Sequence, residues 1–67
     1  MATDKELRDQ LYNMTIAPDE ILLNNKKYEL VSTQLSKKDA LEERDFCHNP
    51  AKVFKYSNGY AIYEYRG

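Results

Sequence analysis

The dipeptide Asn58-Gly59 stands between two runs of β-prone residues in the segment KVFKYSNGYAIYEYRG, residues 52–67. An Asn-Gly pair in this setting is the strongest short-range signal for a β-hairpin, because both residue types accept the positive φ angles of a tight turn. The segment is therefore predicted to form two antiparallel strands. The rest of the chain has to provide the surface against which these strands pack.

Two registers of this hairpin are compatible with the sequence. A two-residue turn pairs Ser57 with Tyr60, and the side chains that then share one face are Phe54, Tyr56, Ala61, Tyr63 and Tyr65. A three-residue loop with a bulge pairs Tyr56 with Tyr60 and sets Lys52 opposite Glu64, a favourable cross-strand pair. Its faces carry Phe54, Tyr56, Tyr60 and Ile62 on one side, and Val53, Ala61, Tyr63 and Tyr65 on the other. In both registers some tyrosines belong to the core and others stay half exposed.

The chain has 67 residues, which predicts one domain over residues 1–67 with a small core. Its only cysteine, Cys47, cannot close an intramolecular disulfide, and with one histidine it cannot complete a four-ligand zinc site. Stability must therefore come from packing within the chain or against a second copy of it. An unpaired thiol fits a reducing compartment.

Residues 3–14 are predicted to form a helix. Thr3 and Glu6 have the spacing of a capping box, and Leu7, Leu11 and Met14 form one apolar stripe. The next segment, DEILLNNKKYELVST over residues 19–33, is read as a hairpin around Asn24-Asn25, in which Ile21 faces Tyr28. Its inward side chains would be Ile21, Leu23, Tyr28 and Leu30. A short helix opened by Pro18 is the alternative for residues 18–25.

A second helix is predicted in LSKKDALEERDFCHNP, with Ser36 as its cap and Pro50 beyond its end. Leu35 and Ala40 are spaced for a hydrophobic staple across the cap. The apolar stripe of this helix consists of Ala40, Leu41 and Cys47. Phe46 falls outside that stripe, so it should cover the first helix or lie at the surface.

These elements predict an α+β fold: an N-terminal helix followed by a ββαββ-like unit. We expect one antiparallel sheet of three or four strands, with the helices packed mainly on one face. The predicted hydrophobic centre consists of Leu7, Leu11, Ile21, Leu23, Leu30, Leu41, Phe54 and Ile62.

Little in the sequence points to catalysis, so a non-enzymatic protein without cofactor or metal is expected. Cys47 and His48 are neighbours on a helix, so their side chains diverge by roughly 100° and do not form a nucleophile–base pair. With two glycines, Gly59 and Gly67, no glycine-rich phosphate loop is available. The start MATDKELRDQ has no apolar signal segment and no run approaches membrane-spanning length, so a cytoplasmic location without membrane contact is expected.

Surface recognition is the function that remains. Basic residues alternate with tyrosines along the C-terminal hairpin, a composition typical of protein interfaces and also of surfaces that stack single-stranded nucleic acid. The principal prediction is an adaptor or inhibitor that binds a partner protein through this hairpin. The alternative is weak nucleic-acid binding by the same surface. The predicted binding residues are Lys52, Lys55, Tyr56, Tyr60, Tyr63, Tyr65 and Arg66.

Self-association is a further expectation, because a small unstapled domain gains stability by forming a homodimer. The stretch IYEY, residues 62–65, would then act as a sheet edge to which another chain adds a strand.

The order of a strand, the capped SKKDA helix and the GYAIYEY hairpin, over residues 27–66, resembles that of many small stand-alone proteins of viruses and archaea. It is also similar to the strand–helix–hairpin core of peptidoglycan-binding SPOR domains. The resemblance is one of pattern and implies no functional residues. A SPOR module would act outside the cytoplasmic membrane, whereas this sequence shows no export signal.

Overall fold

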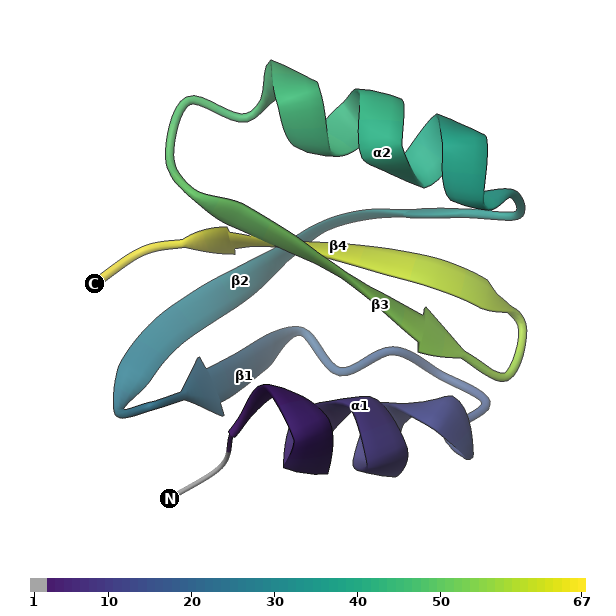
Figure 1. Cartoon of the computed structure of the whole chain (residues 1–67), viewed down its shortest axis with the longest axis horizontal. Helices are drawn as coiled ribbons and strands as arrows, with labels where there is room; N and C mark the ends of the chain where they lie inside the picture. Colours follow the sequence, from purple (N-terminus) through teal and green to yellow (C-terminus); the bar gives the residue numbers. More distant parts are fainter. Residues whose placement is uncertain (1–2) are drawn as a thin grey trace.

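A curled antiparallel sheet forms the centre of the molecule, and a helix lies on each side of it (Figure 1). The computed structural model describes residues 3–67. The strands are ordered β1-β2-β4-β3 in the sheet, and all neighbours are antiparallel. The predicted α+β class is confirmed, and of the three or four strands predicted for the sheet it has four. The elements are α1 (Asp4–Tyr12), β1 (Glu20–Leu23), β2 (Lys26–Gln34), α2 (Lys37–Phe46), β3 (Ala51–Tyr56) and β4 (Gly59–Tyr65).

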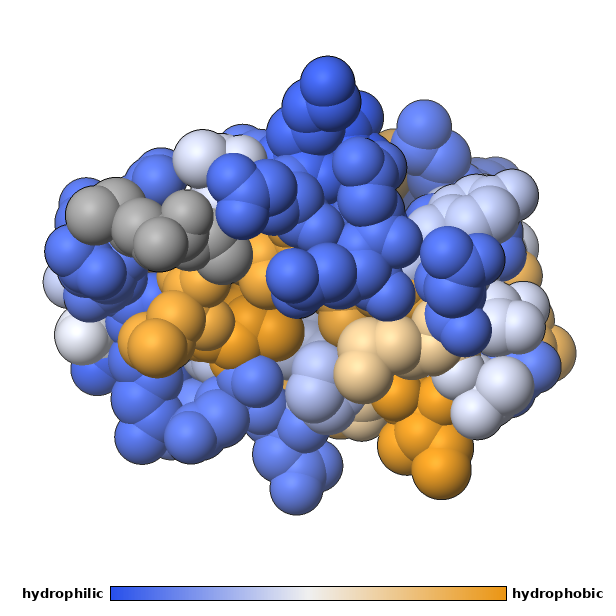
Figure 2. Space-filling view, turned by 90° about the horizontal axis from the view of Figure 1, so that it is seen from below, coloured by the Kyte–Doolittle hydropathy of each residue, from blue (hydrophilic) through white to orange (hydrophobic). Residues whose placement is uncertain are grey.

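Helix α1 begins where the capping pattern predicts. The Thr3 hydroxyl accepts a hydrogen bond from the Glu6 amide, and Leu7 and Leu11 are buried. Met14 does not continue the stripe, because the helix ends at Tyr12 and Met14 lies in the exposed segment that follows. Figure 2 shows the molecule from this side, where hydrophilic residues cover most of the surface and apolar ones are visible in the gaps.

The first hairpin has the predicted register, with Ile21 opposite Tyr28. Asn24 and Asn25 have φ angles of 52° and 67°, the positive values that a two-residue hairpin turn requires at both positions. Ile21, Leu23 and Tyr28 are buried on one face, as the alternation predicts. The alternative short helix over residues 18–25 is therefore wrong.

Helix α2 is capped by Ser36, whose hydroxyl accepts a hydrogen bond from the Asp39 amide at 3.2 Å. The predicted hydrophobic staple does not form, because Leu35 is 88% exposed while Ala40 is fully buried. Phe46 lies at the surface, which resolves the choice left open for it. The cap thus depends on its hydroxyl and not on an apolar contact.

Replacing Ser36 with alanine is expected to lower the free energy of unfolding by about 1 kcal/mol, because the Asp39 amide loses its acceptor. Urea unfolding followed by circular dichroism measures this difference. Ser36→Asp keeps an acceptor at the cap and should restore the loss. An alanine variant as stable as the original protein would show that the hydroxyl does not stabilise the helix.

The C-terminal hairpin has a register that neither prediction contained. Its turn is Ser57-Asn58, and Gly59 is the first residue of β4, opposite Tyr56. The positive φ falls on Gly59, at +151°, whereas Asn58 does not adopt one. A turn with ordinary φ at its two central residues and glycine directly after them is a common alternative to the Asn-Gly turn. Lys52 consequently lies opposite Tyr63 and not Glu64.

One side of the sheet packs against α1. The set predicted for a two-residue turn does share this side, although its pairing was wrong. Tyr65 packs at its margin. The buried cluster here contains Leu7, Leu11, Ala17, Ile21, Leu23, Tyr28, Phe54, Tyr56, Ala61 and Tyr63.

The opposite side of the sheet packs against α2, which contacts β2, β3 and β4. Ala40 and Ile62 are fully buried, and the side chain of Ile62 points away from that of its neighbour Tyr63 because side chains alternate along a strand. The prediction that both helices lie mainly on one face is therefore corrected: the helices cover opposite faces (Figure 1). Helix α1 buries Leu7 and Leu11, and helix α2 buries Ala40.

Two further predictions need correction. Strand β4, which contains IYEY, lies between β2 and β3 and is not a sheet edge, so the edges are β1 and β3. Leu30 and Leu41 are only partly buried, while tyrosines at 28, 56 and 63 supply core volume instead. Within residues 3–67, no helix is long and apolar enough to cross a membrane.

Candidate partner-binding groove

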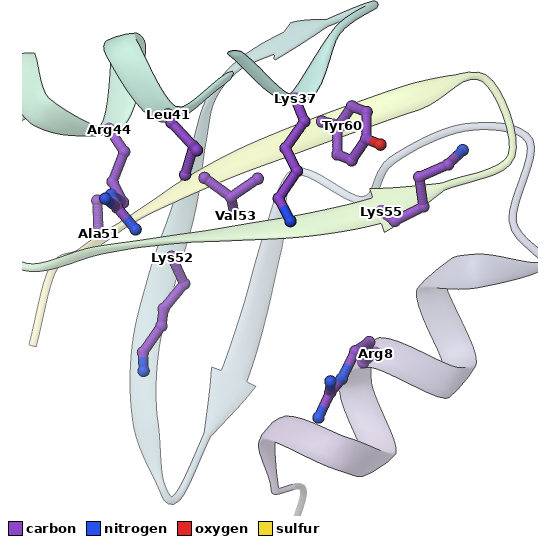
Figure 3. Close-up of a pocket in the computed structure, with 9 residues that line it drawn as sticks. All are labelled: Arg8, Lys37, Leu41, Arg44, Ala51, Lys52, Val53, Lys55 and Tyr60. Carbon is purple, nitrogen blue, oxygen red and sulfur yellow. The ribbon is translucent and has the colours of Figure 1, made fainter. Parts of the chain in front are cut away.

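A groove of about 460 Å³ runs along β3, between the two helices (Figure 3). Its floor is β3, α2 forms one wall, and Arg8 of α1 lies on the other side. We call it the β3 groove. The residues that line it are Arg8, Lys37, Leu41, Arg44, Ala51, Lys52, Val53, Lys55 and Tyr60.

Local periodicity explains why these side chains converge. Lys37, Leu41 and Arg44 are spaced i, i+4, i+7, so they form one stripe along α2. Ala51, Val53 and Lys55 alternate along β3 and share the face that α2 covers. Tyr60 joins them because it lies opposite Lys55 in the hairpin.

The groove is strongly cationic. Five of its lining residues are basic, and none of the lining residues within the described chain is acidic. Lys52 pairs with Asp4 at 3.5 Å and Arg44 with Asp45 at 3.6 Å, both at exposed positions. Exposed pairs of this kind contribute little and are readily exchanged for another anion. In residues 3–67, the other three cations make no ion pair, so the local charge is available to a ligand.

Lys55 marks the end of the groove near the β3–β4 turn. Its ammonium group lies 5.4 Å from the ring centre of Tyr60 and 6.0 Å from that of Tyr12, which is 60% exposed. It also donates a hydrogen bond to the carbonyl oxygen of Tyr56 at 2.7 Å. The lysine is therefore held between two aromatic rings, and its position is defined before any ligand arrives.

Only part of the predicted binding set lies at this surface. Lys52, Lys55 and Tyr60 line the β3 groove. Tyr56 and Tyr63 belong to the core beside α1, and Tyr63 is fully buried. Their burial leaves little side-chain surface at Tyr56, and none at Tyr63, for a partner to contact.

The remaining two predicted residues lie elsewhere. Tyr65 is half buried and packs edge-on against Tyr28 at 5.6 Å between ring centres. Arg66 forms ion pairs with Glu64 at 2.9 Å and Glu29 at 3.4 Å. The hairpin thus does not present one continuous Tyr-rich surface.

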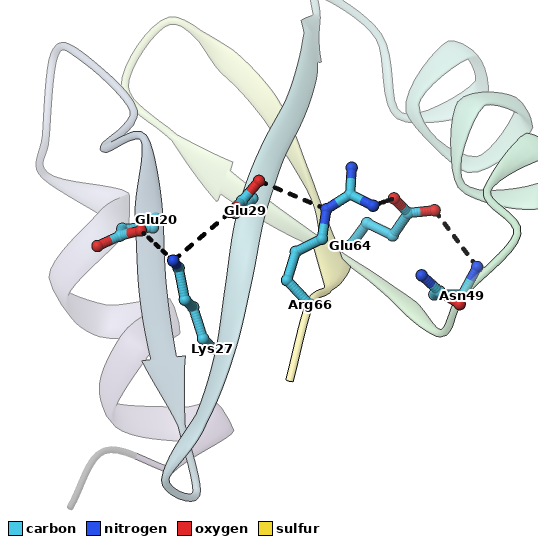
Figure 4. A network of polar contacts seen from close by, with 6 residues as sticks. All are labelled: Glu20, Lys27, Glu29, Asn49, Glu64 and Arg66. Carbon is cyan, nitrogen blue, oxygen red and sulfur yellow. Dashed lines mark hydrogen bonds and ion pairs between the residues drawn. The ribbon is translucent and has the colours of Figure 1, made fainter.

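Arg66 is one member of a polar network that crosses β1, β2 and β4 (Figure 4). Lys27 pairs with both Glu20 and Glu29, and the Glu64 carboxylate also accepts a hydrogen bond from the Asn49 amide. The hydrogen bond to Glu20, with the charges of Glu20 and Glu29, raises the pKa of Lys27 above its usual value. Both cations of this network are paired with carboxylates, whereas three of the five cations of the β3 groove make no ion pair within residues 3–67.

Sequence reasoning missed Arg8, Tyr12, Lys37, Leu41 and Arg44 as surface residues. The i, i+4, i+7 spacing of the α2 stripe was a signal that could have indicated a common face. Nothing in the sequence indicates that Arg8 lies near the same groove, because residues 8 and 44 belong to helices on opposite sides of the sheet.

Cys47 and His48 follow the last residue of α2. Burial, reinforced by the charges of Glu64 and Glu43, raises the pKa of the Cys47 thiol, so it stays protonated at neutral pH. Its Sγ lies 3.6 Å from the carbonyl oxygen of Glu43, while His48 is exposed. No cluster of three or more metal-ligating side chains is found in residues 3–67.

Comparison with known proteins provides no relative: no family model, curated protein or solved structure matches the chain. The pattern resemblance to SPOR domains therefore gains no support.

Proposed function

We propose that this protein is a small non-catalytic interaction module of the cytoplasm, an adaptor or inhibitor, that binds an acidic segment of a partner protein in the β3 groove. The observation that supports the proposal is the concentration of five basic side chains in a concave site, on a chain whose net charge is −1. A local excess of positive charge attracts and orients an anionic partner even when the whole molecule is nearly neutral.

The lining of the groove favours a peptide over a nucleic acid. Leu41, Ala51 and Val53 offer apolar contacts to amino-acid side chains between the cations. Binding of single-stranded nucleic acid relies on a series of aromatic rings that stack successive bases, but Tyr60 is the single aromatic residue among those lining the groove in residues 3–67.

Reversing two charges of the α2 wall should weaken the binding of an acidic peptide. We expect Lys37→Glu combined with Arg44→Glu to reduce affinity for a short fluorescein-labelled peptide of glutamate with interspersed valine by about tenfold or more. Fluorescence anisotropy at low salt measures the change. Lys38→Glu is the matched control, because Lys38 is exposed on the same helix but does not line the groove.

Two outcomes would contradict the proposal. Failure of the unmodified protein to bind the peptide at low salt would exclude an acidic segment as the ligand. A labelled oligothymidylate that binds more tightly than the peptide, and whose affinity falls steeply as salt rises, would assign the groove to nucleic acid instead.

A further inference from the structure

Strand β3 is an edge of the sheet, and its register shows which of its backbone groups are unpaired. The Tyr65 amide donates to the Pro50 carbonyl at 2.8 Å, so residues 50 and 65 form a hydrogen-bonded pair. In an antiparallel ladder such pairs recur at every second residue. Lys52, Phe54 and Tyr56 therefore direct their amide and carbonyl groups toward β4. The groups of Ala51, Val53 and Lys55 point outward.

These outward groups have no backbone partner. Strand β3 pairs only with β4, and no other backbone hydrogen bond within residues 3–67 reaches Ala51, Val53 or Lys55. The other edge, β1, is only four residues long. Proteins usually protect a longer edge by covering it or by placing lysines on it. Lys52 and Lys55 lie on β3, where they discourage pairing with another basic strand and favour an acidic one.

The two helices leave the edge of β3 uncovered between them, along the β3 groove. Helix α1 runs in the same direction as β3, since Asp4 pairs with Lys52 near one end and Tyr12 lies beside Lys55 near the other. Helix α2 borders the opposite side through Lys37, Leu41 and Arg44 (Figure 3). An added strand would lie roughly 4.8 Å from β3, inside the groove between these walls.

We propose that the acidic segment binds as an additional β-strand on the free edge of β3, paired with the backbone of Ala51, Val53 and Lys55. This inference rests on the proposed function and specifies the conformation of the partner. Alternate side chains of the added strand then face the two walls. One set meets Lys37 and Arg44 of α2, and the other meets Arg8 and Lys52.

The backbone requirement can be tested without changing any charge. We would synthesise the glutamate–valine peptide in a series, each member carrying one N-methylated backbone amide, and measure its affinity by anisotropy. A strand uses the amides of alternate residues toward its neighbour. N-methylation should therefore reduce affinity about tenfold or more at every second position and leave the intervening positions within about threefold.

The outcomes separate this inference from the proposed function. If all N-methylated peptides bind with similar affinity, and Lys37→Glu combined with Arg44→Glu still weakens binding, strand addition is rejected and the acidic-segment proposal is retained. Loss of all peptide binding would reject both. A concentration-dependent dimer in sedimentation that the peptide does not dissociate would assign the β3 edge to a second copy of this chain and also overturn the inference.

A variant of the protein provides the complementary test. Val53→Pro removes an outward amide that takes no part in the β3–β4 ladder, a position where an edge strand tolerates proline. We expect it to remain folded by circular dichroism and to lose affinity about tenfold or more, whereas Val53→Ala, which keeps the amide, should stay within about threefold. A folded proline variant with unchanged affinity would overturn the inference. If the proline variant unfolds, the affinities of the N-methylated peptides still test whether the segment binds as a strand.

Discussion

Replacing Gly59 with valine is expected to destabilise the protein strongly and to lower its unfolding midpoint. A Cβ atom at this position would collide with the backbone carbonyl oxygen of Gln34 in the neighbouring strand β2. That oxygen belongs to the sheet and cannot move aside as a flexible side chain would. Glycine also holds a φ of +151° here, a conformation that a β-branched residue resists.

The two costs together come to about 2–6 kcal/mol, and a domain of this size has a total stability of only about 3–10 kcal/mol. Thermal unfolding followed by circular dichroism measures the effect. Gly67→Val is the control, because a Cβ atom at the chain end meets nothing within 4 Å. An unchanged unfolding midpoint for Gly59→Val would disprove the turn and the close approach of β4 to Gln34.

Tyr63→Ala should also destabilise the fold strongly. Its effect should therefore not be limited to a loss of ligand binding. The side chain is fully buried, packs edge-on against Phe54, and its hydroxyl donates to the Pro18 carbonyl at 2.8 Å. Removing a buried ring of this size costs about 3–5 kcal/mol. Tyr12→Ala, at an exposed ring, should change stability by less than about 0.5 kcal/mol. A folded Tyr63→Ala protein that only loses its ligand would contradict the assignment of this ring to the core.

Tyr63→Phe separates the hydroxyl from the ring. It should lower stability by about 1–2 kcal/mol, because the Pro18 carbonyl loses its donor. Burial raises the pKa of Tyr63 from 10.0 to about 12, so the folded state holds this proton more tightly than the unfolded state. Its contribution to stability is complete below pH 10 and is lost as the pH rises toward 12. Urea unfolding across this range should show a smaller loss for Tyr63→Phe than for the original protein.

The C-terminal hairpin contributes only part of the β3 groove. The C-terminal segment does supply Lys52, Lys55 and Tyr60, but the conspicuous tyrosine content reflects core packing. A small domain without disulfide or metal needs large buried side chains, and tyrosine provides them where its hydroxyl finds a partner. Tyr63 meets that condition through Pro18.

The amino-acid sequence by itself determined the features that depend on neighbouring residues. Thr3 and Ser36 cap their helices because the acceptor and the amide are three residues apart. Asn24-Asn25 sets the first hairpin because its turn needs two positive φ angles in succession. The α+β class follows from these local signals, since caps and turns are stabilised by contacts within a few residues of each other.

Only the tertiary structure decided the rest. The insertion of β4 between β2 and β3 makes β3 an edge, and the placement of the helices on opposite faces decides which tyrosines are buried. The position of Gly59 in the hairpin was predicted wrongly. Glycine is required there because a side chain would collide with the backbone of Gln34, a residue of another hairpin. Arg8, Arg44 and Lys52 meet at one groove because the sheet curls between their elements. Such long-range contacts arise from competition among buried surfaces, and no short sequence pattern encodes their outcome.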